Sequence, residues 1–299
     1  MIPGMSKPTR NNEPPRVVVV TGLSGSGKSI ALHVLEDVGY YCIDNLPVSL
    51  FEALVRDITM QPTKARGLTA IGIDARNPGT ELDQLPGLIK RLRDHGVDCE
   101  VVFLDAEDSV LIQRFSETRR RHPLTDDGRT LDQAISLERE MLEPLLDLAR
   151  LNIDTTRTTL HELREIIRAR VAERDSGEMS IMLQSFGFKH GIPRNADFVF
   201  DARCLPNPHW HPDLRPHTGK DKPVAEFLGH DLQVRAMLSH ISDFLTHWIP
   251  CFEREGRSYL TVAIGCTGGQ HRSVYLVEEL TRFLTSQGRN VVNSHRELP

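Results

Sequence analysis

Residues 17–29 read V-V-V-V-T-G-L-S-G-S-G-K-S, and this segment indicates the fold of the first half of the chain. The β-branched run at 17–20 predicts a buried strand, and the next eight residues have the spacing of a phosphate-binding P-loop. Its glycines allow backbone conformations with φ > 0, so amide N–H groups can surround phosphate oxygens. A helix predicted after the loop points its positive end at the same anion. A chance match in a glycine-rich loop would lack these flanks.

The motif also assigns chemical roles. Lys28 is expected to meet the β and γ phosphates and to act in catalysis, and the Ser29 hydroxyl is expected to bind Mg²⁺. A nucleoside triphosphate such as ATP or GTP is the ligand that this arrangement predicts. The expected nucleotide-binding residues of the loop are Gly22, Leu23, Ser24, Gly25, Ser26, Gly27, Lys28 and Ser29.

Downstream of the loop, short apolar runs alternate with amphipathic segments. Strand-like runs at 68–73 and 101–104 are separated by helix-like stretches at 50–58 and 85–92. This alternation predicts an α/β fold with a parallel sheet that carries helices on both faces. Helical segments at 131–148, divided at Pro144, and at 160–172 would close this domain.

An acidic residue follows two of these strands. Either Asp74 or Asp105 could be the carboxylate that holds Mg²⁺ through water, and Asp105, on the more apolar strand, is the favoured one beside Ser29. An aspartate at a strand end also serves as a turn former or helix cap. Farther along, Arg119 and Arg120 open a triple-arginine run that could neutralise transition-state charge on a lid, or could be a solvated basic face.

Composition limits the class of protein. A chain of 299 residues and 33.7 kDa suggests two domains, with boundaries expected at 16–175 and 179–299 after a disordered leader at 1–15. The net charge of −5 gives no general argument for nucleic-acid binding. Five scattered cysteines without a C-x-x-C pair indicate a reduced, cytoplasmic chain. No apolar run approaches the roughly 18 residues of a membrane span.

The second half holds another candidate anion site. An apolar strand at 259–266 leads into C-T-G-G-Q-H-R-S, residues 266–273, and then into a helix. The C-x5-R-S spacing is that of cysteine phosphatases, but Gly265 replaces their usual histidine and no partner acid is identifiable. A non-catalytic phosphate site with Arg272 as the bidentate ligand is therefore preferred. Zinc binding by His209, His211 and His217 in the proline-rich segment before it is a weaker alternative.

Several long motifs occur in one order and make the chain resemble the RapZ family of bacterial nucleotide-binding proteins. They are G-Y-Y-C-I-D-N-L-P at 39–47, D-A-R-N at 74–77, the arginine run, L-P-N-P-H-W at 205–210 and the 266–273 loop. The resemblance spans nearly the whole chain from Arg16 on. It implies that the first domain is a P-loop NTPase domain of kinase-like architecture with ATPase and GTPase activity. It also implies a smaller α/β C-terminal domain that senses glucosamine-6-phosphate, and it favours a homo-oligomer.

The resemblance also implies site residues. The segment assigned to guanine nucleotide corresponds to Asp74, Ala75, Arg76 and Asn77, and the sugar-phosphate pocket corresponds to His209, Thr267, Gly268 and Arg272. Enterobacterial members bind small regulatory RNA and present it to the endonuclease RNase E. This chain departs from them, because it ends S-H-R-E-L-P in place of a basic tail, and fewer cations weaken RNA binding.

Two other hypotheses stay open. A small-molecule kinase would use the same loop and the same arginines to transfer phosphate to an acceptor rather than to water. A non-enzymatic RNA adapter would use the nucleotide only as a switch.

Overall fold

A computed structural model describes residues 15–60, 67–125, 128–172 and 179–298. The expected leader therefore lies almost entirely outside the described residues, as does the expected boundary at 175. The chain divides into two compact units. The first unit comprises the chain up to Phe103 together with Leu111–Ala149. The second unit comprises Leu104–Val110 together with the chain from Arg150 onward.

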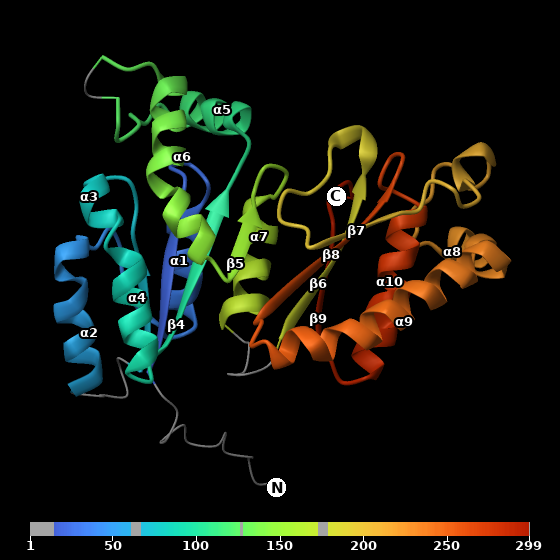
Figure 1. The fold of residues 1–299 in the computed structure, drawn as a ribbon. Helices are drawn as coiled ribbons and strands as arrows, with labels where there is room; N and C mark the ends of the chain where they lie inside the picture. The colour runs from blue at the N-terminus through green and yellow to red at the C-terminus, as the bar shows by residue number, and fades with distance from the viewer. Residues whose placement is uncertain (1–14, 61–66, 126–127, 173–178, 299) are drawn as a thin grey trace, which may run out of the picture. The chain divides into compact units, whose positions relative to one another are not determined.

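The first sheet has five strands in the order β2-β3-β1-β4-β5 (Figure 1). Its central strand β1 ends at the P-loop and is buried along its whole length, as the valine run predicts. β3 pairs in parallel with both β1 and β2. The strands are β1 (Arg16–Gly22), β2 (Tyr41–Ile43), β3 (Leu68–Gly72), β4 (Asp98–Asp105) and β5 (Leu151–Asp154).

Helices join and cover these strands, which confirms the α/β prediction. They are α1 (Lys28–Asp37), η1 (Val48–Leu50), α2 (Phe51–Met60), α3 (Gly79–Leu82), α4 (Leu85–Asp94), α5 (Asp108–Thr118), α6 (Leu131–Leu148), α7 (Leu160–Ile167) and the π-helical turn η2 (Arg168–Ala172). α4 shows why its sequence is helical: leucines and an isoleucine recur at three- and four-residue steps and form its buried side.

Two local expectations were wrong. α6 continues through Pro144, because a capping box between Thr130 and Gln133 fixes its start and its apolar face stays buried on both sides of the proline. The segment around Ile153, between the two expected helical segments and not expected to be a strand, is the edge strand β5. With four residues, β5 is too short for its alternation to stand out from a loop.

The second sheet has four strands in the order β7-β8-β6-β9, with all pairings parallel. Its register aligns Gly187 with Cys266 and Asp201 with Gly265, so three strands end at one edge. The elements are β6 (Ser180–Gly187), η3 (Phe188–His190), β7 (Phe198–Asp201), η4 (Pro208–Trp210), α8 (Lys222–His230), α9 (Leu232–Arg254), β8 (Tyr259–Cys266), α10 (Arg272–Ser286) and β9 (Asn290–His295).

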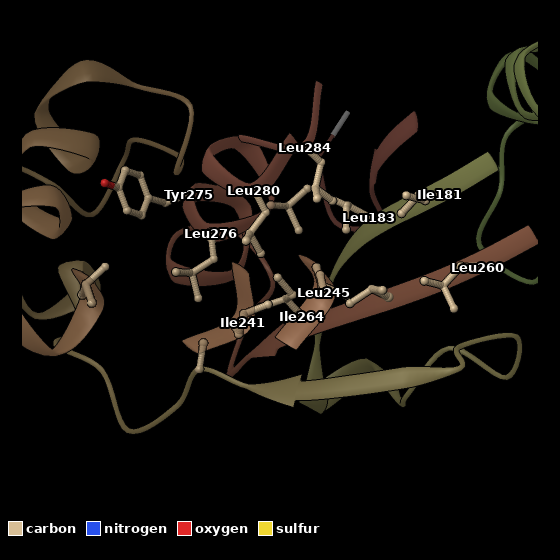
Figure 2. Packing of buried hydrophobic residues seen from close by; sticks show 14 of the residues in the cluster. Ile181, Leu183, Ile241, Leu245, Leu260, Ile264, Tyr275, Leu276, Leu280 and Leu284 are labelled. Carbon is tan, nitrogen blue, oxygen red and sulfur yellow. The ribbon is translucent and has the colours of Figure 1, made fainter. Parts of the chain in front are cut away.

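One apolar cluster holds this second sheet to its helices (Figure 2). Leu260 and Ile264 of β8, Ile241 and Leu245 of α9, and Leu280 of α10 all belong to this cluster. Burying a side chain of this size stabilises the fold by about 1.5 to 3 kcal/mol. The cluster thus fixes β8 and α10, the two elements that flank the 266–273 loop.

Candidate functional sites

The P-loop adopts the geometry that its sequence predicts. Gly22, Gly25 and Gly27 have φ values of 132°, 86° and 109°, in the region that side chains rarely adopt. Gly27 is the N-cap of α1, and its carbonyl accepts hydrogen bonds from the first turn of the helix. The loop therefore presents backbone amides at a helix N-terminus, which is the arrangement that binds phosphate.

Lys28 lies within this loop, where its Nζ donates a 2.6 Å hydrogen bond to the Gly22 carbonyl. Burial lowers the pKa of Lys28, and the negative charges of Glu138, Asp74 and Asp44 oppose that shift. These charges favour the ammonium form that a phosphate ligand needs. Ser29 is exposed beside a cavity of about 130 Å³, which Glu36, Cys42 and Asp44 help to line.

The segment 74–77 closes back on itself in this structure. Arg76 donates to both carboxylate oxygens of Asp74 at 2.6 to 3.0 Å. Burial alone would raise the pKa of Asp74, but these bonds and the charge of Lys28 outweigh it and lower that pKa. Asn77 accepts from the Val48 amide at 2.9 Å and donates to the Leu46 carbonyl at 3.4 Å. The segment thus supports the loop after β2, and its assignment to guanine remains a prediction.

The two metal-ligand candidates differ in setting. Ser29 belongs to the first compact unit, and its exposed hydroxyl is an oxygen ligand of the kind that Mg²⁺ prefers. Asp105 belongs to the second unit and is buried at the end of β4. Its Oδ1 accepts the Ala106 amide at 2.8 Å, and its Oδ2 lies 3.7 Å from Arg194 Nη1. Asp105 therefore has partners, and its role toward metal remains a prediction.

The arginine run follows α5 and is exposed. Arg119 has φ 52°, a left-handed conformation uncommon for a residue with a side chain, and it turns the chain out of the helix. Arg120 and Arg121 follow on the surface, whereas His122 is 2% exposed. The run is thus a surface loop that starts at a strained residue and ends at a buried one.

The 266–273 loop forms a second compact turn at the edge of its sheet. Cys266 Sγ accepts the Gly269 amide at 3.2 Å and lies 3.1 Å from the Ser273 hydroxyl. Arg272 donates to the Arg203 and Leu205 carbonyls at 2.9 and 3.1 Å. These bonds hold the guanidinium rigidly at the N-terminus of α10, as a bidentate anion ligand requires.

Polar atoms in this loop are left without protein partners. Arg272 and His271 are 4% and 7% exposed, yet Arg272 Nε and His271 Nε2 have no hydrogen-bond partner among the described residues. Such orphaned buried donors are costly unless a water or ligand satisfies them. The ring centroids of His209 and His271 lie 6.3 Å apart, and the exposed Thr267 accepts a 3.2 Å hydrogen bond from Arg272 Nη2 at its hydroxyl oxygen. The structure brings the four predicted sugar-phosphate residues to one edge of the sheet.

The last described segment contributes to the same edge. Glu297 Oε2 accepts the Gly187 amide at 2.9 Å, and an added Cβ on Gly269 would lie 2.3 Å from that oxygen. Burial raises the pKa of Glu297, although the charges of Arg296 and Lys189 oppose it. Glu297 thus supports the anion loop through its carboxylate. The resemblance predicted for this segment only that it has fewer cations than the enterobacterial members.

Sequence reasoning missed the buried Glu138, which accepts hydrogen bonds from the P-loop residue Ser24. A signal was present: Glu138 occupies the apolar face of α6 formed by Ala134, Ile135 and Leu142, where a charge is unexpected. Within the described ranges no group of three or more His, Cys, Asp and Glu side chains could hold a metal ion. No helix in those ranges is long and apolar enough to cross a membrane.

Family models match both halves of the chain. A family model described as RapZ-like N-terminal domain matches residues 16–175, and one described as RapZ C-terminal domain matches residues 179–299. A nucleotide-binding protein of Methylococcus capsulatus is 57% identical over 95% of this chain and 96% of its own length. One of Halorhodospira halophila is 54% identical over 95% of this chain and 98% of its own.

Solved structures of kinases resemble part of the chain. A sugar kinase of a Janibacter species is 21% identical, covers 52% of this chain and 93% of its own, and has a TM-score of 0.35. A shikimate kinase of Bacteroides thetaiotaomicron is 16% identical, covers 51% and 96%, and has a TM-score of 0.32. The α/β fold follows from the sheet order itself and not from these likenesses.

Proposed function

The chain belongs to the RapZ family of nucleotide-binding proteins, and on that premise we propose that it is a slow ATPase and GTPase that senses a sugar phosphate. The observation that carries the first part is the P-loop, where Gly27 caps α1 and Lys28 is held inside the loop. A chain with this loop can bind the phosphates of a nucleoside triphosphate and orient the γ-phosphate for attack.

Each residue of the first site has a distinct task in this proposal. The loop amides bind phosphate oxygens, and Lys28 offsets the charge that develops on the transferred group. The Ser29 hydroxyl would hold Mg²⁺, which supplies further charge neutralisation when bound. Arg119 and Arg120 lie on a surface loop from which their guanidinium groups could reach the same charge.

The second site suits a small phosphorylated ligand, which we propose to be glucosamine-6-phosphate. Arg272 and the Thr267 and Gly268 amides would bind its phosphate, and His209 would contact the sugar. The orphaned Arg272 Nε and His271 Nε2 support an anionic or hydroxyl-bearing ligand here. On the family premise we also propose a cytoplasmic homo-oligomer that could present small regulatory RNA to RNase E through cations such as Lys189.

A small-molecule kinase is a second candidate, favoured by the cavity beside Ser29. Its lining includes the carboxylates of Asp44 and Glu36, which could bind hydroxyl groups of an acceptor. An acceptor that speeds ATP consumption and gains the phosphate would establish this activity. Without such an acceptor, water is the nucleophile.

Steady-state hydrolysis of ATP and GTP with Mg²⁺ tests the proposal. The wild type should hydrolyse both, Lys28→Ala should lose at least about 100-fold in rate, and the exposed control Lys90→Ala should match the wild type. Glucosamine-6-phosphate should change the wild-type rate and leave Arg272→Lys unaffected. If the wild type is no faster than Lys28→Ala, the chain is not an NTPase.

A further inference from the structure

A buried carboxylate accepts hydrogen bonds from the P-loop. Glu138 of α6 is 0% exposed. Its Oε2 accepts the Ser24 backbone amide at 2.8 Å, and its Oε1 accepts the Ser24 hydroxyl at 2.7 Å. Ser24 is the third residue of the motif, so one backbone amide of the phosphate-binding loop donates to a protein carboxylate.

The same carboxylate reaches the arginine run. His122, the residue directly after Arg121, lies with Nε2 3.1 Å from Glu138 Oε2. Its Nδ1 accepts the Leu124 amide at 3.2 Å, so the proton of a neutral ring is on Nε2, which donates to Glu138. Burial alone would raise the pKa of Glu138, but His122, Lys28 and Ser24 outweigh it and lower that pKa, so the group is an anion.

The helix that precedes the arginine run also contacts the loop. Arg114 Nη1 donates to the Gly25 carbonyl at 3.0 Å. The Phe115 ring lies within 3.4 Å of a Cβ position on Gly25, and its centroid is 5.1 Å from that of His122. Arg114 thus contacts Gly25 directly, and His122 is linked to Ser24 through Glu138. The three arginines lie between these two connections to consecutive P-loop residues.

We infer that Glu138 is a positioning residue which, through Ser24 and His122, fixes the arginine run to the phosphate-binding loop. The inference deepens the proposed hydrolysis and rests on it for its kinetic consequence. Because the chain is fixed on both sides of the run, Arg119, Arg120 and Arg121 are restricted to a short surface loop. Charged groups that are oriented before the reaction stabilise the transition state more effectively.

A positioning role and a purely structural role of Glu138 predict different effects of Glu138→Gln on nucleotide affinity and kcat. Glu138 carries negative charge near Lys28, in a loop that binds an anion. Removing this charge while keeping the shape, as in Glu138→Gln, should leave nucleotide affinity unchanged or tighter, because repulsion of phosphate falls. The amide cannot accept all three hydrogen bonds, so the tie to His122 should weaken and kcat should fall. A loss of packing alone would weaken binding and turnover together.

The experiment compares Glu138→Gln with Glu143→Gln, an exposed glutamate on the same helix. We expect kcat for ATP to fall roughly 10- to 100-fold in Glu138→Gln, with the Kd of a fluorescent ATP analogue equal or lower, and no change in the control. His122→Ala should show the same pattern. The double variant Glu138→Gln/His122→Ala should be no slower than the slower single variant, since both break one connection.

Limited trypsin digestion gives a readout that does not need hydrolysis. Cleavage after Arg119, Arg120 and Arg121 should be several-fold faster in Glu138→Gln than in Glu143→Gln. Unchanged kcat and unchanged cleavage in Glu138→Gln would overturn the inference, as would a rise in Kd that accounts for the whole kinetic loss. If the wild type lacks hydrolysis, the proposed function fails, and faster cleavage in Glu138→Gln and His122→Ala would still establish the tie. If Glu138→Gln does not fold, Ser24→Ala and His122→Ala decide.

Discussion

Gly269→Ala should disrupt the second anion loop through a specific steric conflict. Gly269 has φ +76°, and a Cβ added there would lie 2.3 Å from Glu297 Oε2 and 2.7 Å from the Gly187 amide nitrogen. One of these neighbours is a side chain that can move, but the other is backbone of β6. The loop must therefore shift away from the sheet edge to accept the methyl group.

Gly288 provides a matched control for the size of this effect. It has the same φ of +76°, but an added Cβ would meet nothing within 4 Å. Gly288→Ala should thus cost only the left-handed backbone penalty, about 1 to 2 kcal/mol. Gly269→Ala adds overpacking of about 1 to 3 kcal/mol, for a total of roughly 2 to 5 kcal/mol.

Tryptophan fluorescence during urea unfolding measures this cost in the right part of the chain. Both tryptophans, Trp210 and Trp248, lie in the second compact unit. The free energy of unfolding should be lower in Gly269→Ala than in Gly288→Ala by about 1 to 3 kcal/mol. Adding Glu297→Ala to Gly269→Ala should recover part of that difference. Equal stability of the two alanine variants would refute the close approach of Gly269 to β6.

Three further changes test other parts of the structure. Asn77→Ala leaves the buried Val48 amide without its acceptor and should destabilise the first unit by about 1 to 3 kcal/mol, measured by thermal unfolding. Burial lowers the pKa of His295, although Glu278 opposes this shift. As the pH falls, the unfolded chain is therefore protonated at His295 before the folded chain. The free energy of unfolding should decline below about pH 6.5 by at most about 1.4 kcal/mol per pH unit. His295→Gln should flatten that decline, and an unchanged slope would contradict the assignment. Arg170 is fully buried in the second unit, and burial lowers its pKa to about 10. Arg170→Ala should lower the free energy of unfolding in urea by roughly 3 to 5 kcal/mol, and a loss below about 1 kcal/mol would contradict this structural role.

The strand, loop and helix at each anion site could be predicted because their signals are local. β1 is a valine run followed by glycines at fixed spacing, and β8 is an apolar run followed by Gly268 and Gly269. In both places the residues that form the strand also set the loop conformation. Short edge strands such as β5 and β7 carry no such signal, because four residues show little periodicity and their pairing depends on distant partners.

The tertiary parts of the sites were not readable in the same way. Glu138 lies more than one hundred positions from Ser24, and only the folded chain brings them together. The bond between Asp74 and Arg76 is local, yet the sequence does not show that it occupies both carboxylate oxygens. Side-chain partners that depend on packing of separate elements therefore emerge only from the structure.

Nucleotide binding at the P-loop, and not at the 266–273 loop, can be measured directly. Titration calorimetry with a non-hydrolysable ATP analogue and Mg²⁺ tests it on the wild type, Lys28→Ala and Arg272→Lys. We predict one binding event per chain that is at least about tenfold weaker in Lys28→Ala and unchanged in Arg272→Lys. Binding that survives in Lys28→Ala and is lost in Arg272→Lys would place the nucleotide at the second loop and contradict the account.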